Sequence, residues 1–190
     1  MLDSIPEREQ CNQILYAGCG IGLHAIDIAL ERPEDRHVVG IDKNKDLYEI
    51  AAHNMSCKSA MNVEFIHTGL ASFACDESAF ETMIIGNGEM LPFEREKIFE
   101  TAYRLLVNDG SVNGRDFAYI ERSRREKISA PYWLDLMSIS EYTKMLVGIG
   151  YSRVSMEPAS QLSNDEIMIP PELNISVGYP MEEVVVVAYK

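Results

Sequence analysis

Three glycines on alternate positions, Gly18, Gly20 and Gly22, form the pattern in this chain that most directly suggests chemistry. They follow the apolar run "ILYA" at 14–17 and precede an amphipathic stretch that begins near Leu23. Glycine has no side chain, so such a turn bends tightly and lets a ligand approach the N–H groups at the start of a helix. The pattern therefore predicts a binding turn between a strand and a helix.

A carboxylate, Asp42, ends the next apolar run, "HVVGID", twenty residues after Gly22. In an open α/β sheet, a carboxylate at this place accepts hydrogen bonds from ribose hydroxyls, and its charge repels a 2′-phosphate. The turn and Asp42 together predict a site for an unphosphorylated nucleoside group. The alternative is that the glycines only relieve crowding and that Asp42 caps the next helix.

The spacing of the glycines bears on which nucleoside ligand binds. A dinucleotide-binding turn reads G-x-G-x-x-G, whereas here the third glycine comes one residue early and Leu23 takes its place. This spacing disfavours NAD, and with it an NAD-dependent oxidoreductase.

The elements that must position these residues alternate along the chain. Apolar runs predict strands at 12–17, 37–42, 62–67, 80–85, 111–120, 151–157 and 182–190. Helical periodicity predicts helices from Leu23 to Pro33, around Leu47–Met55, over about 94–107 before the turn "NDG", and over 138–150, with Ser140 and Glu141 near the start of the last helix. Alternating strands and helices predict a doubly wound α/β fold with a parallel sheet.

Composition limits the possible partners. A chain of 190 residues with 46% hydrophobic residues is expected to form a single domain over 1–190. Its formal net charge of −13 predicts repulsion from nucleic acid. The four cysteines show no close paired spacing, no signal segment is evident, and no apolar run reaches the roughly 18 residues that span a bilayer. We therefore expect a cytoplasmic protein with free thiols that binds neither nucleic acid nor membrane.

Several motifs are similar to those of one enzyme family. "ILYAGCGIG" matches the pattern hydrophobic, hydrophobic, Asp or Glu, hydrophobic, G-C-G-x-G everywhere except the acidic position, and "VVGIDKN" is similar to a ribose-binding motif. "IFETAYRLLVNDGSV" and "SISEYTKMLVGIGYSRVSM" are similar to a later helix-turn-strand and to the last helix with its strand. Over residues 12–157 the chain thus resembles the class I S-adenosylmethionine-dependent methyltransferases, particularly the small-molecule group. The resemblance implies a Rossmann-like fold: one mostly parallel, seven-stranded, doubly wound sheet whose last strand, at 182–190, is antiparallel.

The resemblance also implies a function. S-adenosylmethionine is the implied cofactor, and a small molecule or a protein is the implied methyl acceptor. The residues implied to bind the cofactor are Tyr16, Gly18, Cys19, Gly20, Gly22, Asp42, Lys43, Gly69, Leu70 and Asn87. Glu89 is the candidate catalytic residue: it either takes a substrate proton, binds the amino group of the cofactor, or lies on the surface as a solvated carboxylate. No histidine pair has metal-ligand spacing, so no metal is expected.

Two positions depart from the family pattern. Tyr16 stands where the family has a carboxylate that orients the amino-acid end of the cofactor, and Gly69 stands where an Asp contacts the adenine amino group. Tyr16 is interpreted either as a core aromatic residue with its hydroxyl bonded to a neighbour or as a cofactor contact. Both substitutions favour an alternative function, a catalytically silent methyltransferase-like binding or regulatory subunit.

The chain also has little sequence for the helical lid that usually covers the substrate in this family. About eleven residues precede the first predicted strand, and the connection after the fifth is short. We expect an open site covered by a homo-oligomeric or other partner subunit, or by the irregular, proline-containing loop at about 158–181.

Overall fold

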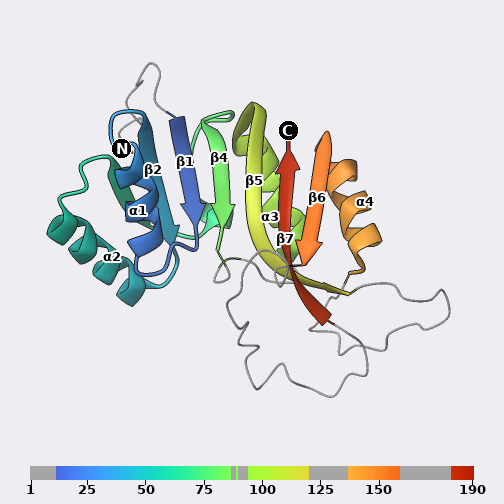
Figure 1. Ribbon diagram of the computed structural model, residues 1–190, viewed down its shortest axis with the longest axis horizontal. Helices are drawn as coiled ribbons and strands as arrows, with labels where there is room; N and C mark the ends of the chain where they lie inside the picture. The colour runs from blue at the N-terminus through green and yellow to red at the C-terminus, as the bar shows by residue number, and fades with distance from the viewer. Residues whose placement is uncertain (1–11, 87–88, 90–93, 120–136, 159–180) are drawn as a thin grey trace.

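A computed structural model of the chain describes residues 12–86, 89, 94–119, 137–158 and 181–190. These residues form one seven-stranded sheet in the order β3-β2-β1-β4-β5-β7-β6 (Figure 1). The strands are β1 Asn12–Ala17, β2 Arg36–Asp42, β3 Val63–His67, β4 Phe80–Ile85, β5 Leu106–Tyr119, β6 Arg153–Pro158 and β7 Met181–Tyr189. All are parallel except β7, which pairs antiparallel with both β5 and β6. The predicted doubly wound sheet with an antiparallel last strand is confirmed.

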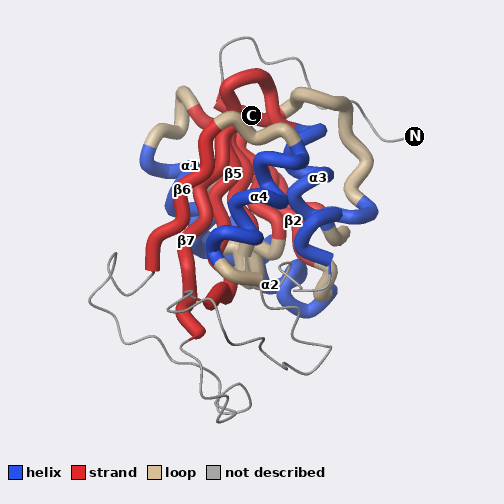
Figure 2. The backbone as a smooth tube through the Cα atoms, turned by 90° about the vertical axis from the view of Figure 1, so that its right-hand side faces the viewer, coloured by secondary structure: helices blue, strands red, loops and turns tan. Residues whose placement is uncertain are grey.

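Helices cover both faces of the sheet in the described part of the chain (Figure 2). They are α1 Leu23–Glu31, α2 Lys45–Lys58, α3 Arg95–Leu105 and α4 Ile139–Ile149, with a short 3-10 helix, η1, at Leu70–Ser72. Side chains of α1 and α2 pack on one face of the sheet, and side chains of α3 and α4 pack on the other. None of the helices in the described ranges is long and apolar enough to cross a membrane.

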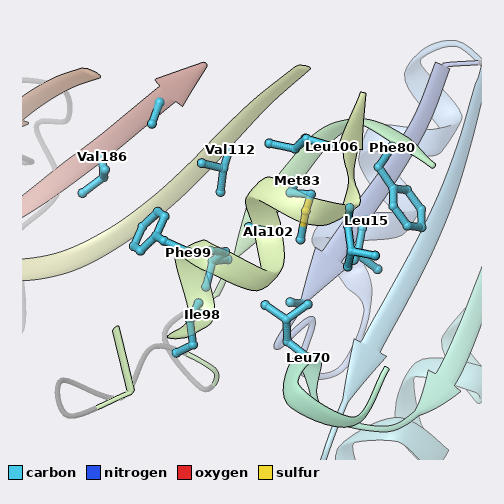
Figure 3. Packing of buried hydrophobic residues seen from close by; sticks show 14 of the residues in the cluster. Leu15, Leu70, Phe80, Met83, Ile98, Phe99, Ala102, Leu106, Val112 and Val186 are labelled. Atoms are coloured by element: carbon cyan, nitrogen blue, oxygen red, sulfur yellow. The ribbon is translucent and has the colours of Figure 1, made fainter. Parts of the chain in front are cut away.

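The first strands are buried on both faces, which explains why they read as continuous apolar runs. In β2, Val38 packs with the α1 and α2 cluster, whereas Val39 packs with the α3 and α4 cluster. Figure 3 shows the second cluster, in which Leu15 and Met83 of the sheet lie near Ala102 of α3. Strands covered on both sides lose the alternation of polar and apolar residues that marks half-exposed strands.

The sequence predicts that a turn at "NDG" (108–110) separates α3 from β5, and this prediction is wrong, because these residues lie within β5. The helix ends at Leu105, and β5 begins at once with Leu106, which pairs with Phe80. The next residue of β5 paired with β4 is Ser111, opposite Thr82, so the residues between form an irregularity in the strand. Asp109, with φ 64°, takes up the bend there.

The last helix, α4, lies within the range 138–150 predicted for it. Ser138 is its N-cap: the Ser138 Oγ accepts a hydrogen bond of 3.2 Å from the Glu141 backbone N–H, while the Glu141 carboxylate accepts one of 3.0 Å from the Ser138 N–H. The helix ends at Ile149, and Gly150, with φ 125°, is its C-cap. The two reciprocal bonds between Ser138 and Glu141 satisfy two backbone N–H groups that would otherwise have no partner at the start of the helix.

Two sequence predictions fall outside the described residues. Asn87 is one of them, and the loop predicted at about 158–181 is the other, apart from its ends in β6 and β7. The extent of the single domain, 1–190, stays a prediction.

Candidate functional site

The glycine turn joins β1 to α1 at the carboxyl edge of the sheet. The Gly18 and Cys19 N–H groups donate to the Ile41 carbonyl at 2.8 and 3.1 Å, which ties the turn to the end of β2. A Cβ atom added at Gly20 would meet nothing within 4 Å, whereas one added at Gly22 would lie 2.5 Å from Cζ of Phe65. Gly22 is therefore required by packing, whereas the turn is open on the side of Gly20.

Asp42, at the end of β2, is bonded to the glycine turn. Its Oδ2 accepts a hydrogen bond of 2.8 Å from the Gly20 N–H, and its Oδ1 accepts one of 2.8 Å from the Asn44 N–H. The α2 helix is capped by the Asn44 side chain, which accepts from the Asp46 and Leu47 N–H groups, so the interpretation of Asp42 as the helix cap is wrong. Each carboxylate oxygen has two lone pairs, so both can still accept a hydrogen bond from a ligand hydroxyl.

Tyr16 is half-buried in β1, on the face covered by α1. Its hydroxyl lies 3.2 Å from Nδ1 of His24, in the first turn of α1, and the two rings meet edge to face. Burial raises the pKa of the Tyr16 hydroxyl above its ordinary value. This arrangement fits a core aromatic residue whose hydroxyl is bonded to a neighbour.

Cys19, inside the turn, is a buried thiol. Burial, and next the negative charge of Asp42, raise the pKa of the Cys19 thiol to about 12. A thiol that stays protonated at neutral pH is a poor nucleophile, which supports a structural role.

Glu89 reaches from the segment after β4 across to the segment after β3. Its backbone N–H donates to the Gly86 carbonyl at 3.0 Å, and its Oε1 accepts a hydrogen bond of 2.7 Å from the Leu70 N–H. The residue is only 6% exposed, so the interpretation as a solvated carboxylate is wrong. Its Oε2 is buried and has no hydrogen-bond partner among the described residues. A buried acceptor without a partner is energetically unfavourable, so Oε2 of Glu89 is the atom of this region best suited to accept a hydrogen bond from a ligand.

Lys43 and Gly69 bring the ends of β2 and β3 together beside Glu89. A Cβ atom at Gly69 would lie 3.6 Å from the Lys43 Cβ and 3.3 Å from Oε1 of Glu89. The carbonyl oxygen of Lys43 lies 3.2 Å from Nε2 of His67. Most of the predicted site residues that the structure describes therefore lie together just beyond the carboxyl ends of β1, β2, β3 and β4. In the described ranges, no three His, Cys, Asp or Glu side chains are placed to hold a metal ion.

Sequence reasoning missed two residues of this region. Asn44 precedes the amphipathic stretch of α2 with an amide side chain, which is a usual N-cap signal and could have identified it. His24 carries no such signal, because its contact with Tyr16 depends on how α1 packs against β1.

Several known proteins with a similar sequence or fold are methyltransferases. Arsenite methyltransferase of Halobacterium salinarum is 27% identical over 99 residues, which are 52% of this chain and 25% of that protein. The chain therefore matches only a quarter of the length of this curated relative.

Three solved structures illustrate the likeness of the fold. Phosphoethanolamine N-methyltransferase 2 of Haemonchus contortus has a TM-score of 0.71 at 12% identity, over 96% of this chain and 49% of that one. The [4+2]-cyclase SpnF has a TM-score of 0.70 at 16% sequence identity, over 96% of this chain and 75% of that one. A SAM-dependent methyltransferase of Aquifex aeolicus has a TM-score of 0.62 at 15% sequence identity, over 95% of this chain and 84% of that one. The family model described as "Methyltransferase domain" matches residues 14–110. That range is more than half of the chain, and the chain therefore belongs to the methyltransferase domain family.

Proposed function

We propose that this protein is an S-adenosylmethionine-dependent methyltransferase that acts on a small-molecule or protein acceptor. The observation that carries the proposal is the pairing of Asp42 with the turn: the Gly20 N–H fixes a carboxylate at the end of β2, and each of its oxygens can accept a further hydrogen bond. This is the arrangement that a ribose requires. The Haemonchus contortus enzyme, which shares the fold, is described in complex with S-adenosyl-L-methionine.

The residues of the site fit this cofactor. The turn is open on the side of Gly20, and Asp42 can accept hydrogen bonds from ribose hydroxyls. Oε2 of Glu89 can accept a hydrogen bond from a donor group of the ligand. When bound, S-adenosylmethionine supplies a methyl group that already carries a good leaving group. The work left to this chain is to hold the ligand in one orientation, align the acceptor with the methyl group and exclude water. We assign no residue as the general base.

Charge supports the choice of acceptor. With a net charge of −13, the surface repels a polyanion beyond the Debye length of about 8 Å at physiological salt, so we propose that nucleic acid is not the acceptor. Cys19, Cys57 and Cys75 are free thiols, which supports a reducing, cytoplasmic location. We further propose that the chain is one domain and that a second copy or a partner subunit covers the site.

A specific observation favours a second candidate, a catalytically silent binding or regulatory subunit. No residue of β1 carries a carboxylate for the amino-acid end of a cofactor, and the Tyr16 hydroxyl lies 3.2 Å from Nδ1 of His24. The fold of the [4+2]-cyclase SpnF is also similar, and one fold can carry different chemistry.

Calorimetric titration with S-adenosylmethionine, S-adenosylhomocysteine and NAD in parallel tests the proposal. We expect both sulfur-containing ligands to bind and NAD not to bind. Replacing Asp42→Ala should weaken S-adenosylhomocysteine binding by about 1–3 kcal/mol, because the ribose loses charge-assisted hydrogen bonds. The control is Asp46→Ala, which removes an exposed carboxylate from the first turn of α2 and should leave the affinity unchanged.

The absence of heat from either sulfur-containing ligand at millimolar concentration would show that the proposed site is wrong. Binding without formation of S-adenosylhomocysteine from S-adenosylmethionine, across small-molecule and protein acceptor pools, would favour the silent subunit.

A further inference from the structure

The buried carboxylate of Glu89 lies next to Gly69, a residue after β3 that has no side chain. A Cβ atom at Gly69 would lie 3.3 Å from Oε1 and 3.9 Å from Oε2 of Glu89. A carboxylate carried by residue 69 would therefore occupy much of the space that the Glu89 carboxylate fills. Gly69 has φ −97° and ψ 162°, an extended conformation that any residue adopts, so backbone geometry does not explain the glycine.

We propose that Glu89 recognises the exocyclic amino group of a purine base and makes the site selective for adenine over hypoxanthine. The proposal rests on the proposed function, since it takes the ligand to be an adenosine derivative. An ionised carboxylate only accepts hydrogen bonds. The adenine amino group donates to it, whereas the 6-oxo group of hypoxanthine presents a second acceptor and is repelled.

The arrangement of the strands indicates which end of the ligand meets Glu89. The ribose partner, Asp42, ends β2, the glycine turn follows β1, and Gly69 follows β3, at the opposite side of β2 from β1. The N–H groups at the start of α1 suit the carboxylate of an amino-acid tail, so the tail lies toward β1. The base then lies toward β3, where the Leu70 N–H holds Oε1 of Glu89 and leaves Oε2 to accept from the base.

The test compares two ligands that differ only at the base, S-adenosylhomocysteine and S-inosylhomocysteine, together with adenosine and inosine, which lack the amino-acid tail. Wild-type protein is expected to bind each adenine ligand roughly tenfold or more tightly than its hypoxanthine counterpart. Glu89→Ala should bring this ratio close to one. Glu96→Ala, which removes an exposed carboxylate from the first turn of α3, should keep the wild-type ratio.

Relocation of the carboxylate provides a second, independent variant. Gly69→Asp alone should weaken binding of the adenine ligands, because two carboxylates then compete for one place. The double variant Gly69→Asp with Glu89→Ala should recover the adenine preference that Glu89→Ala loses. Each ratio compares two ligands on the same protein, so partial loss of folding in a variant lowers both affinities and leaves the ratio informative.

The outcomes separate this inference from the proposed function. If wild-type protein binds S-adenosylhomocysteine without preferring adenine, or if Glu89→Ala retains the preference, Glu89 does not read the base, although the proposed function stands. If Glu89→Ala weakens both homocysteine ligands equally and leaves adenosine binding unchanged, Glu89 holds the ammonium group of the tail and the inference is overturned. If wild-type protein binds none of the four ligands, the proposed function and the inference both fail.

Discussion

Gly20 and Gly22 have similar backbone conformations but different surroundings, and this difference can be measured. Their φ angles are 57° and 75°, so alanine at either position costs roughly 1–2 kcal/mol. At Gly22 the new methyl group would also lie 2.5 Å from Cζ of Phe65 and 2.8 Å from Cβ of Ala51. We expect Gly22→Ala to lower the free energy of unfolding in urea by about 1–3 kcal/mol more than Gly20→Ala.

Ligand binding should rank the same two variants differently. Gly20→Ala is expected to remain folded but adds a methyl group on the open side of the turn, so it should bind S-adenosylhomocysteine more weakly than wild-type protein. Equal free energies of unfolding for the two variants would mean that the packing against Phe65 is not as described.

The thiols should differ in reactivity. Burial raises the pKa of Cys19 to about 12, so this thiol stays protonated until the pH approaches that value. At pH 8 the thiolate fraction is then on the order of one in ten thousand, and Cys19 should resist alkylation by iodoacetamide. Exposed Cys57 should be labelled in the native protein, and Cys19 should be labelled only in urea, as measured by peptide mass mapping. Similar native labelling rates for both thiols would contradict the burial of Cys19.

At the scale of elements, the start of α4 distinguishes two serines two residues apart. The Oγ of buried Ser138 accepts the Glu141 N–H, and Glu141 returns the bond to the Ser138 N–H. Ser138→Ala should therefore lower the free energy of unfolding by about 1 kcal/mol. Ser140→Ala should cost clearly less, because its hydroxyl contacts the Ser138 hydroxyl and caps no backbone group. Urea denaturation of both variants checks the prediction, and a larger loss at Ser140 than at Ser138 would contradict the assignment of Ser138 as the N-cap.

At the scale of the whole molecule, net charge governs which partners approach. Thirty acidic against seventeen basic residues produce a formal charge of −13, which disfavours the counterion release that drives nucleic-acid binding. We expect no shift of labelled single-stranded RNA or double-stranded DNA in gel assays, even at low salt, where attraction would be strongest. Retention of either polymer that weakens as salt is raised would reveal a local basic surface and reopen nucleic acid as an acceptor.

Several features of this protein follow from the sequence by itself. The sequence predicts the strands β1, β2 and β4 to within a residue, because their central residues pack on both faces of the sheet and form short apolar runs. The sequence also predicts the glycine turn and Asp42 at the end of β2, because the conformation of a tight turn and the end of a strand are local properties of the chain. The antiparallel β7 followed from the long connection before it, together with the family resemblance.

Other features were decided only by the tertiary structure. Leu106 enters β5 directly, because its pairing with Phe80 of β4 outweighs the local preference of "NDG" for a turn. Tyr16 meets His24 only after α1 has packed on β1. The burial of Glu89 depends on its contact with Leu70, nineteen residues earlier in the chain. No local pattern encodes such a contact, because the segments after β3 and β4 come together only when the sheet has formed and the carboxyl ends of these parallel strands lie on the same side of it.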